Sequence, residues 1–280
     1  MTDTVAATLQ RTAERLEAAG CESPRLDAEL LVAHVLGLSR AGLYGESRLT
    51  LTDEERAELD RLVSRRERRE PLAYVLGEWG FRRLTLRVDR RVLVPRPETE
   101  IVVERALARI DGLSQPHVLD VGTGSGAIAL AVADEHPGAR VTAIDSSEDA
   151  LAVARENAAR TGLLVEVVHW DLFGGLPDGP WDLVVSNPPY VRPDEIASLE
   201  REVREWEPRS ALVGEGATEA VARSAKAVLR PGGALVLEVA DGTAEDVAAL
   251  LRELGYRDVA VTPDLAGRDR VVEGVTTSAD

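Results

Sequence analysis

The run His117-Val118-Leu119-Asp120-Val121-Gly122-Thr123-Gly124-Ser125-Gly126 decides how this 280-residue chain folds. Its apolar half predicts a buried strand, and the residues from Gly126 to about Glu135 predict a helix. Glycines at a turn of this kind let the backbone approach a ligand, and the start of the helix offers unpaired N–H groups. The run therefore predicts nucleotide binding, with a purely structural glycine turn as the alternative.

Strands and helices alternate outward from this turn to the end of the chain. Strands are predicted at residues 118–121, 140–144, 164–169, 183–186, 234–239, 256–261 and 269–275. Helices are predicted at residues 126–135, 147–161, 217–229 and 243–254. This alternation implies a mostly parallel sheet with helices on both faces. The last two strands have no helix between them, which implies one antiparallel strand at the edge. We expect an α/β fold with a seven-stranded Rossmann-like sheet whose last strand is antiparallel.

The first part of the chain predicts helices and carries no metal or nucleophile motif. Its leucines recur at helical spacing. Ser23-Pro24 is typical of a helix start, and Gly20 and Gly37 are typical of helix ends. A further helix starts near Asp53, with acidic residues in its first turn, and ends before Pro71. These patterns predict a small N-terminal helical bundle.

The change of pattern along the chain predicts three parts. They are a helical domain at residues 1–75, a β-hairpin linker at 76–95 and the α/β domain at 96–280. Short strands are expected in the linker at 78–81, 84–88 and 92–94. Pro97 is expected in the first turn of the helix that follows, where its missing N–H is harmless.

The composition excludes several classes of protein. The chain has 33 basic and 49 acidic residues, a net charge of −16, so we expect no direct sequence-specific nucleic-acid binding. Cys21 is the only cysteine, which excludes an internal disulfide and a thiolate metal cluster, and we expect no metal. No apolar run approaches the ~20 residues of a membrane span, and Met1-Thr2-Asp3-Thr4 lacks the basic start of a signal peptide. We expect a cytoplasmic monomer with no membrane partner.

One stretch is basic against this acidic background. Between Arg61 and Arg96, eleven arginines oppose only four acidic residues, which is a local charge of +7. Two interpretations stay open for this stretch. The arginines form solvated helix and strand faces, or they form a docking strip for an acidic partner.

A second motif, Asn187-Pro188-Pro189-Tyr190, follows the apolar run at 181–186 that predicts a buried strand. The Asn187 side-chain oxygen and the Pro188 carbonyl can each accept one N–H of a planar NH2 group, which aims the nitrogen lone pair. Tyr190 can stack on that planar group. The motif therefore predicts methyl transfer to a planar nitrogen. The alternative is a Pro-Pro turn with a capping Asn.

The two motifs together select the cofactor. Residues 122–127 also satisfy the dinucleotide pattern G-x-G-x-x-A, but a hydride-transfer enzyme has no use for Asn-Pro-Pro-Tyr. Asp145 ends the second strand, where an acid would bind a ribose, although it could instead cap a helix in competition with Ser146-Ser147. Asp120 could face the cationic end of a cofactor. The prediction is S-adenosylmethionine.

The chain resembles, along almost its whole length, the HemK-type glutamine N5-methyltransferases that modify peptide-chain release factors. The matching stretches are Pro71-Leu72-Ala73-Tyr74-Val75-Leu76-Gly77, Leu93-Val94-Pro95-Arg96-Pro97-Glu98-Thr99-Glu100, the glycine turn at 119–130, Ser186-Asn187-Pro188-Pro189-Tyr190 and Glu207-Pro208. Asn-Pro-Pro-Tyr alone is shared with DNA adenine and rRNA guanine methyltransferases. The Pro95–Glu100 segment, together with the N-terminal helices, is more specific. The resemblance implies that the substrate is the glutamine of the Gly-Gly-Gln motif in bacterial release factors, and that the helical domain recognises it.

The resemblance also implies which residues form the site. The cofactor-binding residues would be Gly122, Thr123, Gly124, Ser125, Gly126, Asp145, Asp171, Leu172 and Asn187. The substrate-binding residues would be Asn187, Pro188, Pro189 and Tyr190, with Asn187, Pro188 and Tyr190 as the catalytic ones. The chain departs from the family pattern in two places. Leu172 stands where some members have Trp, and residues 238–243 differ from the usual Glu-x-Gly loop.

Three rival functions stay open beside this one. A glutamine methyltransferase of a ribosomal protein would share the domains and the chemistry. A DNA or RNA base methyltransferase would need a basic cleft and aromatic platforms, which a chain with 4% aromatic residues and a net charge of −16 does not supply. A nucleotide-binding module without enzymatic activity would bind the cofactor but transfer no methyl group.

Overall fold

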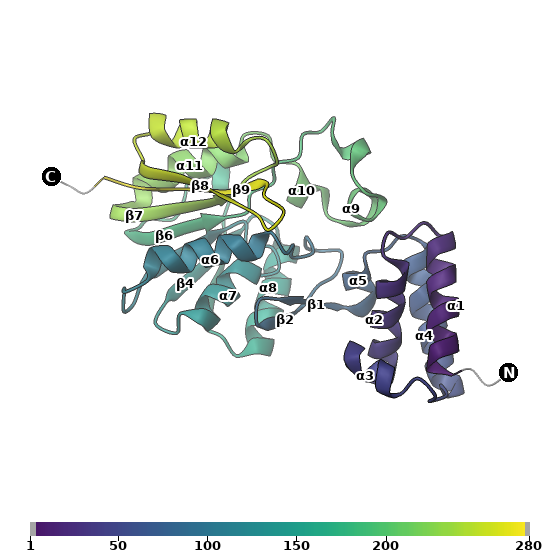
Figure 1. Cartoon of the computed structure of the whole chain (residues 1–280). Helices are drawn as coiled ribbons and strands as arrows, with labels where there is room; N and C mark the ends of the chain where they lie inside the picture. Colours follow the sequence, from purple (N-terminus) through teal and green to yellow (C-terminus); the bar gives the residue numbers. More distant parts are fainter. Residues whose placement is uncertain (1–3, 278–280) are drawn as a thin grey trace. The chain divides into compact units, whose positions relative to one another are not determined.

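The computed structural model describes residues 4–277, so residues 1–3, on which the predicted lack of a signal peptide partly rests, lie outside the described range. The chain divides into two compact units. The first comprises Met1–Glu78 and Glu200–Trp206, and the second comprises Trp79–Leu199 and Glu207–Asp280. No described helix is long and apolar enough to cross a membrane. Figure 1 follows the chain through both units.

Helices build the first unit, as the leucine spacing predicts. They are α1 (Val5–Ala18), α2 (Pro24–Leu36), α3 (Arg40–Gly45), α4 (Asp53–Glu67), α5 (Leu72–Leu76) and, from much later in the sequence, α9 (Arg201–Trp206). Pro24 is the first residue of α2, and Gly37 ends that helix in the left-handed region with a φ of 63°. Thr52 and Glu55 form a reciprocal capping box at the start of α4. The predicted limits of α2 and the predicted start of α4 are confirmed.

A buried cluster of charges holds the first unit together. Arg66 Nε lies 2.7 Å from Asp27 Oδ2, and Arg66 Nη1 lies 2.8 Å from Glu202 Oε1. Arg69 donates to both carboxylate oxygens of Glu202 at 2.6 Å. Because Arg66 is only 6% exposed, its charge is tolerated only when it is paired. Glu202 supplies part of that counter-charge, so α9 packs with helices that precede it by more than a hundred residues.

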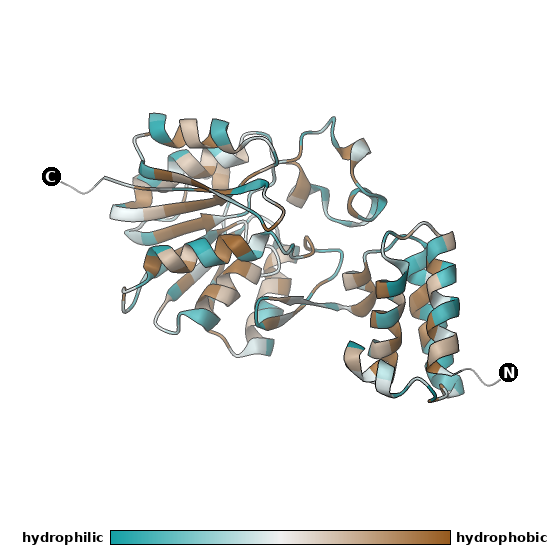
Figure 2. Cartoon of the chain, in the orientation of Figure 1, coloured by the Kyte–Doolittle hydropathy of each residue, from teal (hydrophilic) through white to brown (hydrophobic). Residues whose placement is uncertain are grey.

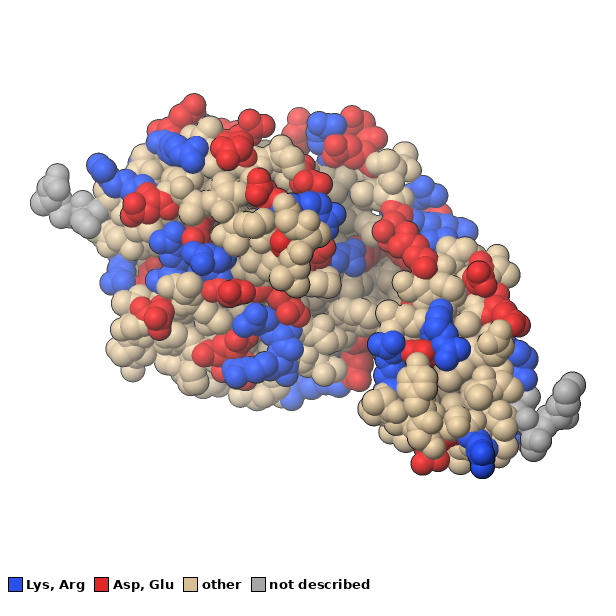
Figure 3. Space-filling model, viewed as in Figure 1, with Lys and Arg blue, Asp and Glu red and all other residues tan. Residues whose placement is uncertain are grey.

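Most arginines between Arg61 and Arg96 form ion pairs with acidic residues of the chain. Pairs within the protein engage Arg61, Arg65, Arg66, Arg69, Arg82, Arg83, Arg87, Arg91 and Arg96. Figure 3 shows acidic and basic side chains interspersed over the visible face. Most arginines of this stretch therefore form ion pairs with acidic residues of the same chain. The hypothesis of a docking strip for an acidic partner stays a prediction, whereas the buried Arg66 does not belong to a solvated face.

A seven-stranded sheet forms the second unit, with the order β5-β4-β3-β6-β7-β9-β8. Its strands are β3 (His117–Val121), β4 (Arg140–Asp145), β5 (Val165–His169), β6 (Trp181–Ser186), β7 (Leu229–Glu238), β8 (Arg257–Pro263) and β9 (Asp269–Val275). The pairings from β5 to β7 are parallel, and β9 is antiparallel to both of its neighbours. The predicted Rossmann-like class and the antiparallel last strand are confirmed.

Three local predictions are wrong. The chain turns back after β8 and places β9 between β7 and β8, so β8 lies at the edge instead of the antiparallel last strand. Residues 92–94 form no strand, because their apolar pattern reflects burial. The hairpin consists only of β1 (Glu78–Phe81) and β2 (Leu84–Arg87). Pro97 precedes α6 (Thr99–Ile110), whose N-cap is Glu98, so it lies outside the first turn.

Helices cover both faces of the sheet (Figure 1). One face carries α6, α7 (Ala127–Glu135) and α8 (Glu148–Thr161), and the other carries α11 (Ala217–Val228) and α12 (Ala244–Glu253). Successive strand residues point to opposite faces. Leu183 and Val185 of β6 therefore belong to the first core, under α6 and α7, and Val184 belongs to the second core, under α11 and α12. Figure 2 shows β6 and β7 as mainly apolar ribbons. Both cores are therefore built on strands that are buried on two sides, as parallel strands are.

The register between β3 and β6 brings the two sequence motifs to one place. Val121 pairs with Ser186, and the Ser186 hydroxyl donates to the Val121 carbonyl oxygen at 2.7 Å. The glycine turn starts at the residue after β3, and Asn-Pro-Pro-Tyr starts at the residue after β6. Since neighbouring strands lie about 4.8 Å apart, both motifs begin side by side at the carboxyl edge of the sheet.

The buried charge cluster predicts a large difference between two arginine substitutions in α4. Arg66→Met leaves the buried Asp27 without its cation, and we expect it to lower the free energy of opening the first unit by about 3–5 kcal/mol. Arg61→Met is the matched control, because the Arg61–Glu58 pair is exposed, and its effect should stay under about 1 kcal/mol. Native-state amide hydrogen exchange of α2 and α4 measures both values. Equal effects of the two substitutions would contradict the role given to the cluster.

Candidate active site

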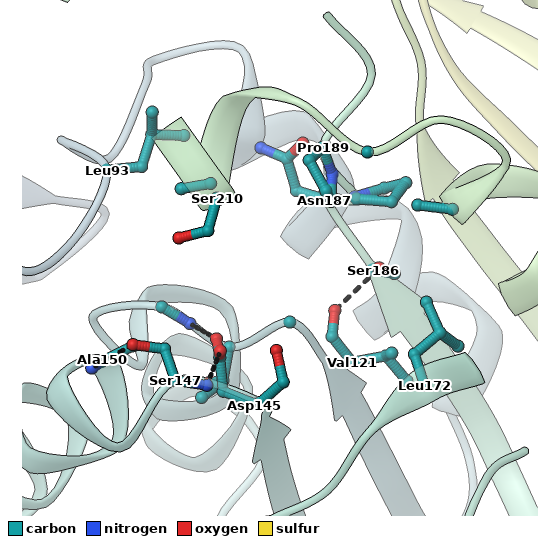
Figure 4. A pocket seen from close by; sticks show the side chains of 18 of the residues that line it. Leu93, Val121, Asp145, Ser147, Ala150, Leu172, Ser186, Asn187, Pro189 and Ser210 are labelled. Atoms are coloured by element: carbon teal, nitrogen blue, oxygen red, sulfur yellow. Dashed lines mark hydrogen bonds between the residues drawn. The ribbon is translucent and has the colours of Figure 1, made fainter. Parts of the chain in front are cut away.

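A cavity of about 360 Å³ opens at the carboxyl ends of β3, β4 and β6. Most of the predicted site residues line it, namely Gly122, Thr123, Gly124, Ser125, Asp145, Asp171, Leu172, Asn187, Pro188 and Pro189. Figure 4 shows Asn187 and Pro189 on one side of the cavity, with Asp145 and Ser147 on the other. Two predicted residues are not in its lining. Gly126 packs beside Leu130 and Ala154 instead, and Tyr190 lines a second cavity of about 480 Å³.

The glycine turn is tied to the end of the neighbouring strand. The N–H groups of Gly122 and Thr123 both donate to the Ile144 carbonyl oxygen, at 2.9 and 3.0 Å. Gly122 and Gly124 have φ angles of 73° and 56°, in the left-handed region that glycine adopts without strain. The turn can therefore follow the floor of the cavity closely and lead into α7.

Asp145 presents a carboxylate that the chain already holds in place. Its two oxygens accept the N–H groups of Gly124 and Ser147, each at 2.9 Å (Figure 4). Burial raises the pKa of the carboxyl, and these backbone donors oppose that rise. The N-cap of α8 is Ser147, whose hydroxyl accepts from the Ala150 N–H. Asp145 is therefore not the cap of that helix, and its remaining lone pairs can accept hydroxyl groups of a ligand.

A short helical turn, η1 (Leu172–Gly174), closes another wall of the cavity. The Asp171 carboxylate accepts the Phe173 N–H at 3.0 Å, and the Trp170 indole donates to the Gly175 carbonyl oxygen at 2.8 Å. Leu172 packs against the second core. Phe173 lines the cavity yet is 68% exposed, and the sequence offered no signal that singled it out. The turn thus supplies apolar surface for a flat ligand group.

The Asn-Pro-Pro-Tyr segment is braced by the chain that follows η2 (Ile196–Ser198) and α9. The Val191 N–H donates to the Leu212 carbonyl oxygen at 2.9 Å, at the end of α10 (Arg209–Leu212). A side chain at Gly214 would meet the carbonyl oxygen of Pro189 at 2.7 Å. Only glycine allows the two backbones this close approach, so the Pro-Pro turn is fixed from its outer side.

Polar partners that the motifs did not predict lie behind Asn187. The Asn187 side-chain N–H donates to Thr99 Oγ1 at 3.2 Å, and the Thr99 hydroxyl donates to Glu238 Oε2 at 2.6 Å. The Tyr190 hydroxyl also points to Glu238, at 3.4 Å from Oε1. Burial and the neighbouring Glu238 raise the pKa of Tyr190 to about 12, so the phenol is neutral. Thr99 lies inside the Pro95–Glu100 segment, which the sequence had marked without assigning it a task.

The same segment is fixed by an ion pair. Arg96 donates to both carboxylate oxygens of Glu207, at 2.8 and 2.7 Å, and the Glu207 side chain is 1% exposed. Two stretches that carried the family resemblance are therefore joined at the cavity rim, where Arg96 is one of the lining residues.

Asp120 does not face the cavity, contrary to the sequence expectation. It is fully buried and does not belong to the lining. Its Oδ2 accepts from the Thr123 hydroxyl at 2.7 Å and from the Ala129 N–H at 3.2 Å, whereas its Oδ1 has no hydrogen-bond partner. Burial raises the pKa of this carboxyl to about 7, against those two donors. Asp120 therefore supports the glycine turn from beneath.

Known proteins similar to this chain share both of its parts. Residues 7–77 match a family model described as the PrmC N-terminal domain, and residues 99–204 match the methyltransferase small domain. A release factor glutamine methyltransferase of Caulobacter vibrioides is 41% identical over 94% of this chain and 93% of its own length. Another from Deinococcus radiodurans is 44% identical over 94% and 95%. The chain is also similar to a solved structure, that of the 16S rRNA N2 G1207 methyltransferase of T. Thermophilus, with 19% identity and a TM-score of 0.53. The match covers 71% of this chain and 49% of that chain. At this identity it shows a shared fold and nothing more.

The buried Asp120 predicts an unusual dependence of stability on pH. In the unfolded chain its pKa is near 4, whereas in the folded protein it is about 7. Between these values the folded state binds the extra proton, so stability falls as pH rises from about 4 to about 7. Asp120→Asn should remove this contribution and be more stable than the native protein at pH 8 by about 1–3 kcal/mol. Urea titrations at pH 5 and pH 8 measure it, and a variant less stable than the native protein at pH 8 would refute the prediction.

Proposed function

The chain belongs to the family of release factor glutamine methyltransferases, and we propose that it methylates the side-chain amide nitrogen (N5) of the glutamine in the Gly-Gly-Gln motif of bacterial peptide chain release factors. The methyl donor is S-adenosylmethionine. One observation supports the assignment to this chain: the glycine turn and Asn187 directly follow the paired residues Val121 and Ser186 and line the same cavity.

The residues around the cavity fit the cofactor. Its volume of about 360 Å³ lies within the usual range for small-molecule sites. The prearranged Asp145 carboxylate can accept the hydroxyl groups of the ribose, and Leu172 with Phe173 offers apolar surface to the adenine. The turn at 122–125 leaves room for the amino-acid end. When bound, S-adenosylmethionine supplies a methyl group that the positive charge on its sulfur makes easy to displace.

Asn187 and Pro188, which we call the clamp, orient the amide nitrogen of the target, which is a weak nucleophile. The lone pair of an amide nitrogen is delocalised, so the chain must orient it and stabilise the positive charge that develops on nitrogen. Asn187 Oδ1 and the Pro188 carbonyl oxygen can each accept one N–H of the target, which turns the remaining nitrogen face toward the cofactor pocket. Proline has no N–H that could compete for the carbonyl. The proton released from nitrogen can pass to water, so no strong base is needed.

Tyr190 completes the clamp as an aromatic wall. Its hydroxyl is directed to Glu238, which leaves the ring to flank the planar group of the glutamine. Because its pKa is raised to about 12, it adds no charge near the developing cation. Its place in the second cavity fits a substrate strand that runs past the clamp.

We propose that the N-terminal helical domain binds the protein substrate. The proposed parts are residues 1–75 for recognition, 76–95 for the hairpin linker and 96–280 for the methyltransferase domain, of which Glu200–Trp206 packs in the helical unit. Support comes from the match of residues 7–77 to a separate N-terminal family model. A protein that acts on release factors works in the cytoplasm, and we propose a monomer that binds no nucleic acid directly.

The proposed target predicts where a labelled methyl group appears. With radiolabelled S-adenosylmethionine, a purified release factor should become labelled, and its Gly-Gly-Gln variant with Gln→Ala should stay unlabelled. A ribosomal-protein fraction and a DNA fragment serve as controls for the rival functions. Equal label on the factor and on its Gln→Ala variant would refute the target, and label on a ribosomal protein alone would favour the rival enzyme.

The proposed clamp predicts a separation of binding from turnover. Asn187→Ala removes the side-chain acceptor, and we expect kcat to fall by about 10²–10³-fold. The dissociation constant of S-adenosylmethionine should change much less, because the glycine turn and Asp145 remain. Single-turnover kinetics and calorimetry measure the two quantities. A kcat close to the native value in Asn187→Ala would contradict the proposed role of Asn187.

A further inference from the structure

The carboxamide of Asn187 can face the substrate in two ways. Its oxygen and its nitrogen are nearly the same size, so packing alone does not choose between them. With the oxygen inward, Asn187 accepts an N–H of the target. With the nitrogen inward, two NH2 groups oppose each other and the target is repelled. The direction of this one amide therefore decides whether the clamp of the proposed function works.

Thr99 settles the direction because a hydroxyl carries a single proton. That proton is donated to Glu238 Oε2 at 2.6 Å, so the Thr99 oxygen is left with lone pairs only. The Asn187 nitrogen lies 3.2 Å from it and donates to it. If the amide turned over, Asn187 Oδ1 would face Thr99 Oγ1 with no proton between the two oxygens. The turned state is therefore disfavoured by repulsion and by the loss of a hydrogen bond.

Glu238 keeps the Thr99 proton in its place. It is the last residue of β7 and only 1% exposed, and the Tyr190 hydroxyl also points to it. Burial raises its pKa, whereas Thr99, the nearby Arg270 and Tyr190 lower it, and Glu98 raises it slightly. An ionised carboxylate can only accept hydrogen bonds, so Thr99 donates to Glu238 in this direction.

We propose that Thr99 and Glu238 are positioning residues, forming a chain from Glu238 through Thr99 to Asn187 that holds the Asn187 carboxamide oxygen toward the target nitrogen. This inference rests on the proposed function. It gives a task to Thr99 of the Pro95–Glu100 segment and to Glu238, and neither residue needs to touch the substrate. The three residues come from α6, β7 and the end of β6, so the fold of one unit assembles the chain of hydrogen bonds.

The chain offers an unusually clean test, because Asn157 and Asn187 are its only asparagines. Labelling asparagine with 15N gives two side-chain NH2 signals in a nuclear magnetic resonance spectrum. Asn157 is the internal control, since its NH2 group donates to the carbonyl oxygens of Arg87 and Ser125 and not to Thr99 or Glu238. In Thr99→Val we expect the Asn187 pair to shift and exchange faster with water, while the Asn157 pair stays unchanged.

Kinetics supply the second measurement. Thr99→Val should lower kcat toward a glutamine-containing release factor by about tenfold or more, with the affinity for S-adenosylmethionine within about threefold of native. Thr99→Ser, which keeps the hydroxyl, should restore both kcat and the Asn187 signal. If the valine variant does not fold, Thr99→Ala is read in the same way. Native kcat and an unmoved Asn187 signal in a folded variant without the hydroxyl would overturn the inference.

Asn187→Ala distinguishes a failure of the positioning role from a failure of the proposed clamp. Loss of turnover in Asn187→Ala together with native behaviour of Thr99→Val overturns only the positioning role. Native turnover in Asn187→Ala overturns the proposed clamp itself. Loss of turnover in both, with rescue by Thr99→Ser, supports both.

Discussion

The pairing of β3 with β6 is the constraint on which the whole site depends. Val121 lies opposite Ser186, so the glycine turn and Asn187 leave the sheet from adjacent backbone positions. A slip of one residue would move every side chain of β6 to the other face. It would exchange the members of the two cores and turn the end of the strand away from the cavity. The apolar residues that alternate between the cores therefore also set where methyl donor and acceptor meet.

Three strands around this edge each contribute one acidic residue with a different task. Asp145 ends β4 and faces the cavity, Asp120 lies beneath the glycine turn on β3, and Glu238 ends β7 behind the clamp. All three carboxyls have their pKa raised by burial. Each accepts hydrogen bonds that fix a particular piece of chain. In the proposed mechanism these buried acids orient backbone N–H groups and hydroxyl groups, and none is needed as a base.

The sequence was enough to place the seven strands of the large sheet, the glycine turn and the Asn-Pro-Pro-Tyr segment, because these depend on local periodicity and on motifs at strand ends. It failed where the answer depends on partners far away in the chain. Thr99 and Glu238 are 139 residues apart, and Arg66 and Glu202 are 136 apart. No local sequence pattern predicts such pairs. The sequence therefore indicated neither the acidic partner of Arg66 nor a role for Thr99. The insertion of β9 inside the sheet is likewise a choice of pairing that composition does not encode.

In the proposed mechanism, Asn187 presents its carboxamide oxygen to the nitrogen that is methylated. A crystal structure of the protein with S-adenosylhomocysteine and a peptide containing Gly-Gly-Gln tests it most directly. We expect the glutamine side-chain nitrogen at about 3 Å from both Asn187 Oδ1 and the Pro188 carbonyl oxygen, with Asn187 Nδ2 still donating to Thr99 Oγ1. A glutamine nitrogen held by other groups, or an Asn187 amide turned so that its nitrogen faces the peptide, would contradict it.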